Sequence, residues 1–290
     1  MTEQNHDPDN GRLIVQGADR PGIVASVSGA LTEFGANIVW LDQSSSDPAG
    51  GRFFQRTEFH LPGLSGRLDE LGEALQRNLG DELGLEFRLL ETRRRKRVAI
   101  MVSKTDHCLL DLLWRQRRGE LQMDVPLVIS NHADLGDEVR GFGIPFFHVP
   151  VANGDKTAAE KEQLNLLKGN VDLVVLARYM QIVSGDFLTD IGVPVINIHH
   201  SFLPAFMGAG PYQRAKERGV KLVGATAHYV TEDLDEGPII EQDVVRVSHR
   251  ETVRELQRRG ADIERLVLSR AVGWHCEDRV IRDGNTTVVF

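Results

Sequence analysis

From residue 98 onward, short apolar runs alternate with stretches of helical periodicity, and this alternation limits the possible folds more than any other feature of the sequence. Strands that are apolar throughout are buried on both faces, which is typical of a parallel sheet with helices on each side. We therefore predict a doubly wound, mostly parallel α/β sheet over residues 98–290, with ligands bound beyond the carboxyl ends of its strands. The expected strands are 98–102, 125–129, 146–149, 171–176, 193–198, 220–230 and 239–247; the expected helices begin near 106, 134 and 157, and a long amphipathic one covers 250–272.

The first 91 residues follow a different pattern. Strands are expected at 12–16, 37–45, 52–60 and 85–90, with helices after Pro21 and over 66–78. This βαββαβ order is the ferredoxin-like arrangement. The composition then changes at the basic run 93–97, which we interpret as a solvated linker rather than a nucleic-acid patch. The predicted organisation is a small α/β domain over 1–91, a linker over 92–97 and the larger domain over 98–290.

Composition and charge exclude several classes of protein. A net charge of −8 argues against a chain that coats nucleic acid, because phosphate binding needs a basic surface. No run of about 18 apolar residues predicts a membrane span, and the polar first ten residues lack the pattern of a signal peptide, so we expect a cytoplasmic protein. Cys108 and Cys276 have no metal-ligand spacing, so neither a disulfide framework nor a metal site is predicted.

The first strand and helix are joined by the polar turn Gly17-Ala18-Asp19-Arg20-Pro21-Gly22. Asp19 is placed to cap the helix, and Pro21 suits its first turn. The turn is explained either as a well-capped junction or as a small-ligand site. Over residues 11–91 the segment resembles the ACT domain, which carries this D-R-P-G-I-V pattern. The resemblance implies binding of an amino acid or a related effector, homo-oligomers paired side by side, and regulatory contacts at Gly17, Asp19, Pro21, Gly22 and Asn37.

The strongest chemical signal lies where the strand 193–198 ends. Alternate residues of a strand share a face, so Asn197 and His199 are expected to point the same way and His200 the opposite way. Two converging donors suit the oxyanion that forms when a nucleophile attacks a carbonyl. Of the carboxylates in the loop 231–238, Asp235 precedes a tight Glu-Gly-Pro turn and is the one expected to point inward, with His228 to orient it. The other acidic residues of this loop are interpreted as solvated.

The Asn-x-His motif at 197–199 and the His-x6-Asp motif at 228–235 make residues 97–284 resemble the folate-dependent formyltransferase-type catalytic domain. The resemblance implies that Asn197, His199 and Asp235 are catalytic and that the substrate is a folate. It also implies a folate pocket lined by residues 177–183. The expected substrate-binding residues are Arg178, Met180, Gln181, Ile182, Val183, His200 and Ser201.

Two departures from the family pattern favour hydrolysis over transfer. Members that transfer formyl to a nucleotide carry a glycine-rich phosphate loop after the first strand, but this chain reads Ser103-Lys104-Thr105-Asp106-His107 there. His200 stands where the family has proline, and the segment 206–212 is also rebuilt. We therefore expect 10-formyltetrahydrofolate to be hydrolysed to tetrahydrofolate and formate, without metal or cofactor. The formate would supply purine synthesis and balance one-carbon pools.

Two other functions compete with hydrolysis. One is formyl transfer to an amine acceptor, which loss of the glycines does not exclude for an amino sugar or tRNA. The other is an inactive folate or amino-acid sensor, against which retention of all three catalytic positions argues. Glycine and methionine are the expected effectors of such a hydrolase, because both report on one-carbon supply.

Overall fold

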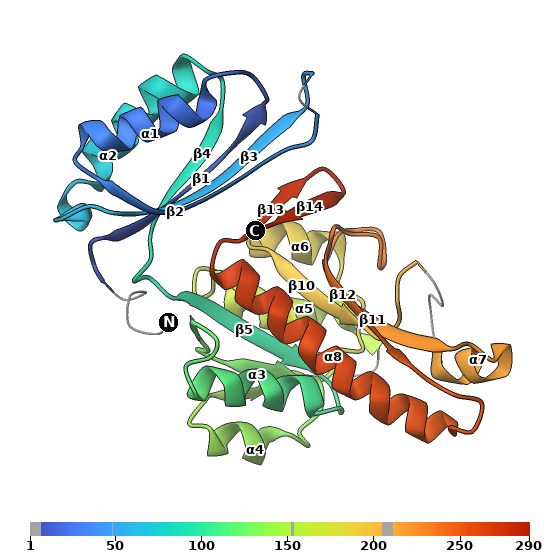
Figure 1. Ribbon diagram of the computed structural model, residues 1–290. Helices are drawn as coiled ribbons and strands as arrows, with labels where there is room; N and C mark the ends of the chain where they lie inside the picture. The colour runs from blue at the N-terminus through green and yellow to red at the C-terminus, as the bar shows by residue number, and fades with distance from the viewer. Residues whose placement is uncertain (1–6, 48, 152–153, 205–210) are drawn as a thin grey trace. The chain divides into compact units, whose positions relative to one another are not determined.

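The computed structural model describes residues 7–47, 49–151, 154–204 and 211–290 (Figure 1). The chain divides into two compact units, residues 1–95 together with Phe290, and residues 96–289. Strand β5 begins at Lys96, inside the segment expected as a linker. Arg97 is fixed there because its guanidinium and backbone N–H both bond Asp172.

The first unit has one antiparallel sheet in the order β2-β3-β1-β4. Its element order confirms the predicted βαββαβ arrangement, with a short 3-10 turn and a π-helical extension around its second helix. The apolar sides of β1, β3, α1 and α2 form a single core that includes Leu13, Phe59 and Leu71. The elements are β1 (Asn10–Ala18), α1 (Ile23–Glu33), β2 (Asn37–Ser45), β3 (Arg52–His60), η2 (Leu64–Gly66), α2 (Leu68–Leu75), η3 (Gln76–Asp81) and β4 (Glu86–Glu91).

The start of α1 differs from the expected cap. Gly22 is the N-cap residue, with a φ of 95°, and no side chain caps the helix. Asp19 instead accepts a hydrogen bond from the Ser45 hydroxyl at the end of β2. The prediction that Asp19 caps α1 is therefore wrong, because the turn is closed by a left-handed glycine.

The second unit has a long mixed sheet in the order β12-β11-β10-β9-β5-β7-β8, with β6 (Met123–Asp124) beside β5. The strands from β10 to β8 are parallel, whereas β11 and β12 are antiparallel to their neighbours, so the mostly parallel prediction is confirmed. The strand expected at 125–129 is paired with its neighbours only from Val128. The strands are β5 (Lys96–Val102), β7 (Val128–Ser130), β8 (Phe146–His148), β9 (Leu173–Leu176), β10 (Val195–His199), β11 (Leu222–Tyr229) and β12 (Ile239–Arg246).

Helices cover both faces of this sheet (Figure 1). Val98, Ile100 and Val102 of β5 belong to a core with α3, α4 and α8. The alternate residues Ala99 and Met101 belong to a separate core with α5 and α6, which confirms the doubly wound arrangement. The helices are α3 (His107–Arg117), α4 (Gly136–Gly141), α5 (Lys156–Leu167), α6 (Gly185–Ile191), α7 (Pro211–Arg218) and α8 (Val253–Cys276).

Some elements of the second unit were not predicted. These are α6, α7 and the terminal hairpin of β13 (Val280–Asp283) and β14 (Thr286–Val289). The short helix α6 begins where the Ser184 hydroxyl accepts a hydrogen bond from the Phe187 N–H. Seven residues are too few to show a helical repeat, so only this cap marks it in the sequence.

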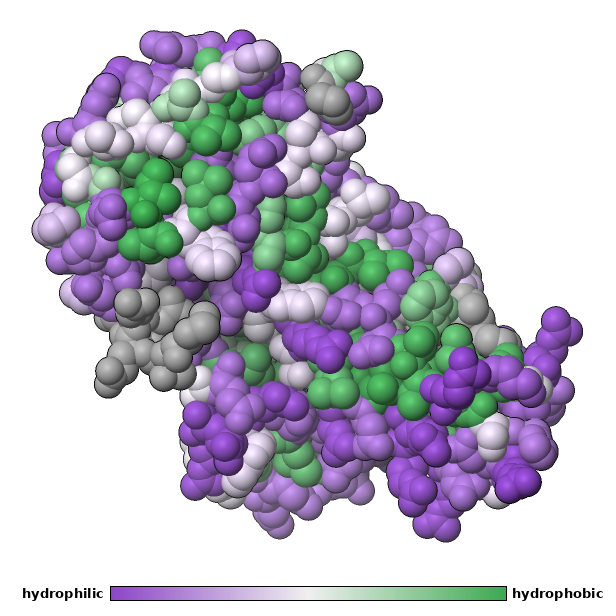
Figure 2. All heavy atoms as spheres, viewed as in Figure 1, coloured by the Kyte–Doolittle hydropathy of each residue, from purple (hydrophilic) through white to green (hydrophobic). Residues whose placement is uncertain are grey.

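Polar and apolar side chains are mixed on the surface. On the face shown in Figure 2, hydrophilic side chains surround smaller groups of hydrophobic ones on both units. Exposed large apolar side chains are spread over several elements, including Trp40 on β2, Trp114 on α3 and Leu266 on α8. Scattered exposure of this kind is usual for folded domains. None of the helices in the described part of the chain is both long and apolar enough to cross a membrane.

Candidate active site

A cavity of about 370 Å³ lies at the carboxyl ends of β9 and β10, where a doubly wound sheet is expected to bind ligands. It brings together the four predicted catalytic residues and the predicted folate segment. Ser201 does not line it; its backbone carbonyl accepts a hydrogen bond from Thr226. The lining residues are Leu176, Arg178, Tyr179, Met180, Gln181, Ile182, Val183, Asn197, Ile198, His199, His200, His228, Val230, Thr231, Glu232, Leu234 and Asp235.

Asn197 and His228 are neighbours because β10 pairs with β11 in a register that places them opposite each other. The Asn197 Nδ2 atom lies 3.2 Å from His228 Nε2, and His228 Nδ1 lies 3.0 Å from the Tyr229 carbonyl oxygen. Because the carbonyl can only accept, His228 carries its proton on Nδ1 and accepts from the Asn197 amide at Nε2. The second N–H of that amide is then left for a ligand.

Asp235 is held toward the histidines by an unusual backbone. Its φ is 59°, in the left-handed region that aspartate tolerates better than most residues. Gly237, two residues later, lies so close to β11 that a Cβ there would stand 1.8 Å from the Tyr229 carbonyl oxygen. The Asp235 carboxylate lies 3.2 Å from His199 Nδ1 and 3.7 Å from His228 Nε2. The inward position expected from the tight turn is confirmed.

The charge state of Asp235 follows from these neighbours. The hydrogen bond with His199 is the largest of the effects that hold the pKa of Asp235 well below its usual range despite partial burial. The carboxylate is therefore ionised throughout the neutral range. An ion this stable is a poor proton acceptor, so its contribution is to orient and polarise His199.

His199 is the buried imidazole that pairs with Asp235. It is only 6% exposed, and its Nδ1 faces Asp235. Its Nε2 atom is buried and has no hydrogen-bond partner within the described residues. A carboxylate on one nitrogen and a vacant position at the other is the arrangement of a histidine that exchanges protons with a substrate.

His200 departs from the expected alternation. The strand β10 ends at His199, so His200 does not point to the opposite face but also lines the cavity. Its ring centroid lies 5.2 Å from that of His199 and 6.1 Å from that of Tyr212. Burial, followed by the charge of Arg178, lowers the pKa of His200 to about 4. It is therefore neutral at pH 7.

The wall formed by residues 178–183 has the character expected of a pocket for a flat heterocycle. Met180 and Ile182 are 58% and 59% exposed, although they line a cavity. The Ser103 hydroxyl fixes this segment by accepting from the Met180 N–H at 2.9 Å and donating to Asn131 at 2.7 Å. Exposed apolar side chains on a fixed backbone provide a contact surface for an aromatic ligand.

A buried carboxylate, Glu264 of α8, was missed by the sequence analysis. It accepts hydrogen bonds from His107 Nε2 and the Tyr212 hydroxyl, both at 2.8 Å, and lies 3.5 Å from Arg178 Nε. Burial alone would raise the pKa of Glu264, but the bond from His107 and the charge of Arg178 lower it to about 2. The available signal was an acidic residue within the apolar stripe of an amphipathic helix.

The same cluster is the one described group whose spacing could hold a metal ion, with ligand atoms of His107, Cys108 and Glu264 within 4.8 Å of one another. Its chemistry does not suit a cation. The Arg178 guanidinium lies against the carboxylate, and burial, with the charge of Glu264, raises the pKa of Cys108, which keeps the thiol protonated. Thiols bind metals as thiolates, so the cluster is better described as a buried carboxylate that is held by His107, Tyr212 and Arg178.

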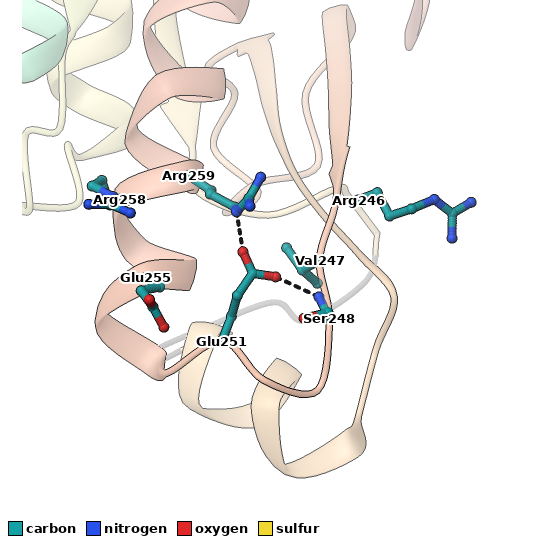
Figure 3. A pocket seen from close by; sticks show the side chains of 7 residues that line it. All are labelled: Arg246, Val247, Ser248, Glu251, Glu255, Arg258 and Arg259. Atoms are coloured by element: carbon teal, nitrogen blue, oxygen red, sulfur yellow. Dashed lines mark hydrogen bonds and ion pairs between the residues drawn. The ribbon is translucent and has the colours of Figure 1, made fainter.

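A second hollow lies where α8 begins (Figure 3) and is lined by Arg246, Val247, Ser248, Glu251, Glu255, Arg258 and Arg259. Its charges are largely compensated internally. Glu251 accepts from the Ser248 N–H and pairs with Arg259. Thr252 and Glu255 form a capping box that satisfies the start of the helix. The 370 Å³ cavity is therefore the better candidate for the active site.

Four of the positions expected to bind an effector lie in or beside the turn between β1 and α1, whereas the fifth, Asn37, is the first residue of β2. Gly17 packs so closely that a Cβ would stand 2.6 Å from Leu85 Cδ2. Pro21, Gly22 and Asn37 are exposed, and Asp19 is bound to Ser45. Close packing requires a glycine at position 17, and the φ of 95° favours a glycine at position 22. Both glycines are therefore explained by the fold, without a bound effector.

Comparison with known proteins places these features in context. Residues 96–272 match the family model described as formyl transferase, and residues 11–76 match the ACT domain model. A formyltetrahydrofolate deformylase of Mycobacterium tuberculosis is 64% identical over 97% of this chain and 91% of its own length. A crystal structure of a formyltetrahydrofolate deformylase from Pseudomonas syringae pv. tomato superposes with a TM-score of 0.92 at 46% identity, covering 97% of this chain and 94% of that one.

Transformylases match over a shorter part of the chain. The crystal structure of glycinamide ribonucleotide transformylase 1 from Symbiobacterium toebii superposes with a TM-score of 0.64 at 34% identity, covering 68% of this chain and 94% of that one. The similarity to deformylases extends over nearly the whole chain, so it includes the ACT unit as well as the catalytic one.

Proposed function

The chain belongs to the formyltetrahydrofolate deformylase family, and from this premise we propose that it hydrolyses 10-formyltetrahydrofolate to tetrahydrofolate and formate in the cavity lined by His199 and Asp235. The observation that carries the catalytic assignment is the pairing of an ionised, partly buried carboxylate with His199 Nδ1. The other nitrogen, His199 Nε2, is buried and has no hydrogen-bond partner among the residues that the structure describes. Hydrolysis requires a group that takes a proton from water and returns it to the leaving nitrogen.

His199 Nε2 is the proposed proton carrier. Asp235 keeps the imidazole proton on Nδ1, so Nε2 has a lone pair for the attacking water. The water oxygen bonds to the formyl carbon as its proton passes to Nε2. The imidazolium then delivers this proton to N10 of the folate, the carbon–nitrogen bond breaks, and tetrahydrofolate and formate leave.

The oxyanion of the tetrahedral intermediate needs donors that are already in place. Asn197 offers the N–H that is not used by His228, and His199 becomes a second donor once it is protonated. His228 holds the amide in this orientation because its own Nδ1 is fixed by the Tyr229 carbonyl. Side chains therefore stabilise the oxyanion and carry the transferred proton. We propose that no metal or cofactor takes part.

The apolar wall of residues 180–183 is proposed to hold the pterin ring, with Gln181 and Arg178 beside it. His200, neutral at pH 7, is proposed to line the side of the cavity that faces the formyl group. Transfer to an amine acceptor is the alternative reaction, but the similarity to deformylases over 97% of the chain favours water.

We also propose a metabolic use for the formate, a cellular compartment and an effector for the enzyme. The formate would supply purine synthesis, and the two buried free thiols, Cys108 and Cys276, fit a reducing cytoplasm. The match to the ACT model supports an amino-acid effector, glycine or methionine, and pairing of ACT units in a homo-oligomer.

An isotope experiment tests whether water is the nucleophile. Hydrolysis in water enriched in ¹⁸O should give formate that carries one ¹⁸O atom per turnover. Formate without the label would mean that another nucleophile takes the formyl group first, and the proposal would have to be abandoned.

A further inference from the structure

The buried carboxylate of Glu264 does not belong to the catalytic pair, yet it lies beside the catalytic cavity. Arg178 both lines the cavity and faces Glu264, with 3.5 Å between Nε and the carboxylate oxygen. Tyr212, which donates to Glu264, lies next to His200, another lining residue. One layer of side chains therefore separates Glu264 from the reaction site.

The groups around Glu264 are those that normally bind an anionic ligand. His107 is the first residue of α3, and its Nε2 contacts the carboxylate, while Arg178 contributes a guanidinium and Tyr212 a hydroxyl. A helix start combined with an arginine and neutral donors is a usual site for phosphate or carboxylate groups. Here the anion is supplied by the chain itself. The Glu264 side chain is 3% exposed, so solvent does not compete for these donors.

The structure also makes room for this contact. Gly260 lies one helical turn before Glu264, in the interior of α8, where glycine is less favourable than alanine. A Cβ at this position would stand 1.8 Å from the Tyr212 hydroxyl oxygen. The absence of a side chain at Gly260 therefore lets the Tyr212 ring pack against α8 and reach Glu264. The hydrogen bond between Tyr212 and Glu264 depends on this glycine.

We propose that Glu264 is a specificity-determining residue whose carboxylate permanently occupies an anion site beside the catalytic cavity, so that an amine acceptor carrying a phosphate or carboxylate cannot bind there. It accepts hydrogen bonds from His107 and Tyr212 and neutralises the charge of Arg178. The inference rests on the proposed hydrolysis and deepens it, because filling this site leaves water as the nucleophile. Asp106, which lies where nucleotide formyltransferases carry the glycine-rich phosphate loop, is exposed and makes no side-chain cap of α3.

Inorganic phosphate is the probe that tests the proposal. In Glu264→Ala the carboxylate is replaced by space beside unpaired donors, so millimolar phosphate should raise the melting temperature and inhibit hydrolysis competitively with the formylfolate. The parent enzyme should show neither effect. Asp262→Ala is the matched control, because it removes an exposed carboxylate from the same helix. A Glu264→Ala variant that folds and shows no response to millimolar phosphate would overturn the proposal.

Glu264→Gln keeps the side-chain volume and guards against a variant that fails to fold. It removes the charge opposite Arg178, so millimolar phosphate should inhibit this variant competitively with the formylfolate, whereas the parent should not respond. A folded Glu264→Gln variant that millimolar phosphate does not inhibit would also overturn the proposal. The melting temperature reports phosphate binding without any turnover, whereas formate release by the parent enzyme reports hydrolysis. The two measurements therefore show separately whether the anion-site proposal or the proposed hydrolysis is wrong.

Discussion

At the scale of single residues, the proposed chemistry depends on different roles for Asp235 and His199. Asp235 is too acidic to remove a proton from water, whereas His199 has a vacant nitrogen directed away from it. The carboxylate is thus a permanent charge that fixes the tautomer of its neighbour. The geometry therefore favours a role for Asp235 in orienting His199 over direct deprotonation of the water.

Replacing Asp235 by Asn should test this role. The amide keeps the volume but can leave His199 in the other tautomer, with its proton on Nε2, so turnover should fall by about 100-fold to 10,000-fold. Folate binding should change little, because the apolar wall is untouched. Formate release and the affinity for tetrahydrofolate measure the two effects. Asp233→Asn, in an exposed position of the same loop, is the control, and comparable activity in both variants would refute the role.

His200 gives a prediction about pH. Its pKa is about 4 in the folded chain and about 6.5 when unfolded, so the folded state favours the neutral form. The associated stability is complete above pH 6.5 and is lost as the pH falls towards 4. Between pH 7 and pH 5 the free energy of unfolding of the parent should therefore decrease by about 1–2 kcal/mol more than that of His200→Asn.

Chemical denaturation at the two pH values measures this difference. His148→Asn replaces an exposed histidine and should behave like the parent. Equal pH dependence of the parent and His200→Asn would show that His200 is not buried in its neutral form.

At the scale of elements, α8 shows how one helix serves both packing and the active site. Its apolar stripe includes Leu256, Val267 and Leu268, and Gly260 and Glu264 occupy the same buried side. The helix begins with a complete capping box at Thr252 and Glu255. A well-anchored helix can tolerate an interior glycine and a buried charge, provided that each is matched by a partner.

Gly260→Ala should destabilise the protein even though alanine is the better helix former. The new Cβ would meet the Tyr212 hydroxyl, and overpacking of this kind costs about 1–3 kcal/mol. Gly29→Ala in α1, where a Cβ meets nothing within 4 Å, should instead stabilise by about 0.5–1 kcal/mol. Unfolding curves of both variants test the contrast, and stabilisation by both would show that Tyr212 does not pack against α8 as observed.

Much of the element order could be predicted because the signals are local. The strands at 37–45 and 52–60 have the expected bounds, and the alternating runs of the second unit indicated a parallel sheet covered on both faces. The helix α6 and the hairpin β13–β14 were missed, since seven-residue and four-residue elements are too short for periodicity to be visible. The prediction that Asp19 caps α1 was wrong because Gly22 is the N-cap residue of this helix.

The active site was predictable to the extent that strand geometry determines it. Asn197 and His199 share a face of β10, and the Glu-Gly-Pro turn holds Asp235 inward. The contact between Asn197 and His228 depends on the antiparallel register of β10 and β11, which no local signal gives. Glu264 and Tyr212 come from two distant helices, and their meeting is a result of tertiary packing alone.

At the scale of the whole molecule, the chain joins a catalytic unit to a unit of the ACT family. An effector that changes hydrolysis must bind the two functional states of the enzyme with different affinities. Linkage then requires that the folate substrate change the affinity for the effector by the same factor.

Glycine or methionine is therefore expected to change the apparent affinity for the formylfolate by about 5-fold to 150-fold. Asp19→Ala, which removes the bond to Ser45, should reduce the effect, whereas Glu33→Ala, on the exposed side of α1, should not. Initial rates at a series of amino-acid concentrations measure the coupling. Rates that are independent of both amino acids would exclude them as effectors.

The proposed hydrolysis requires no amine acceptor, and formate release in the absence of any acceptor is its most direct test. The purified protein is incubated with 10-formyltetrahydrofolate in the absence of any amine acceptor, and formate and tetrahydrofolate are quantified over time. Equal amounts of both products, formed over many turnovers and lost in Asp235→Asn, are the predicted result. If tetrahydrofolate forms only after an amine is added, and the formyl group is recovered on that amine and not as formate, the protein is a transferase and the proposed hydrolysis is wrong.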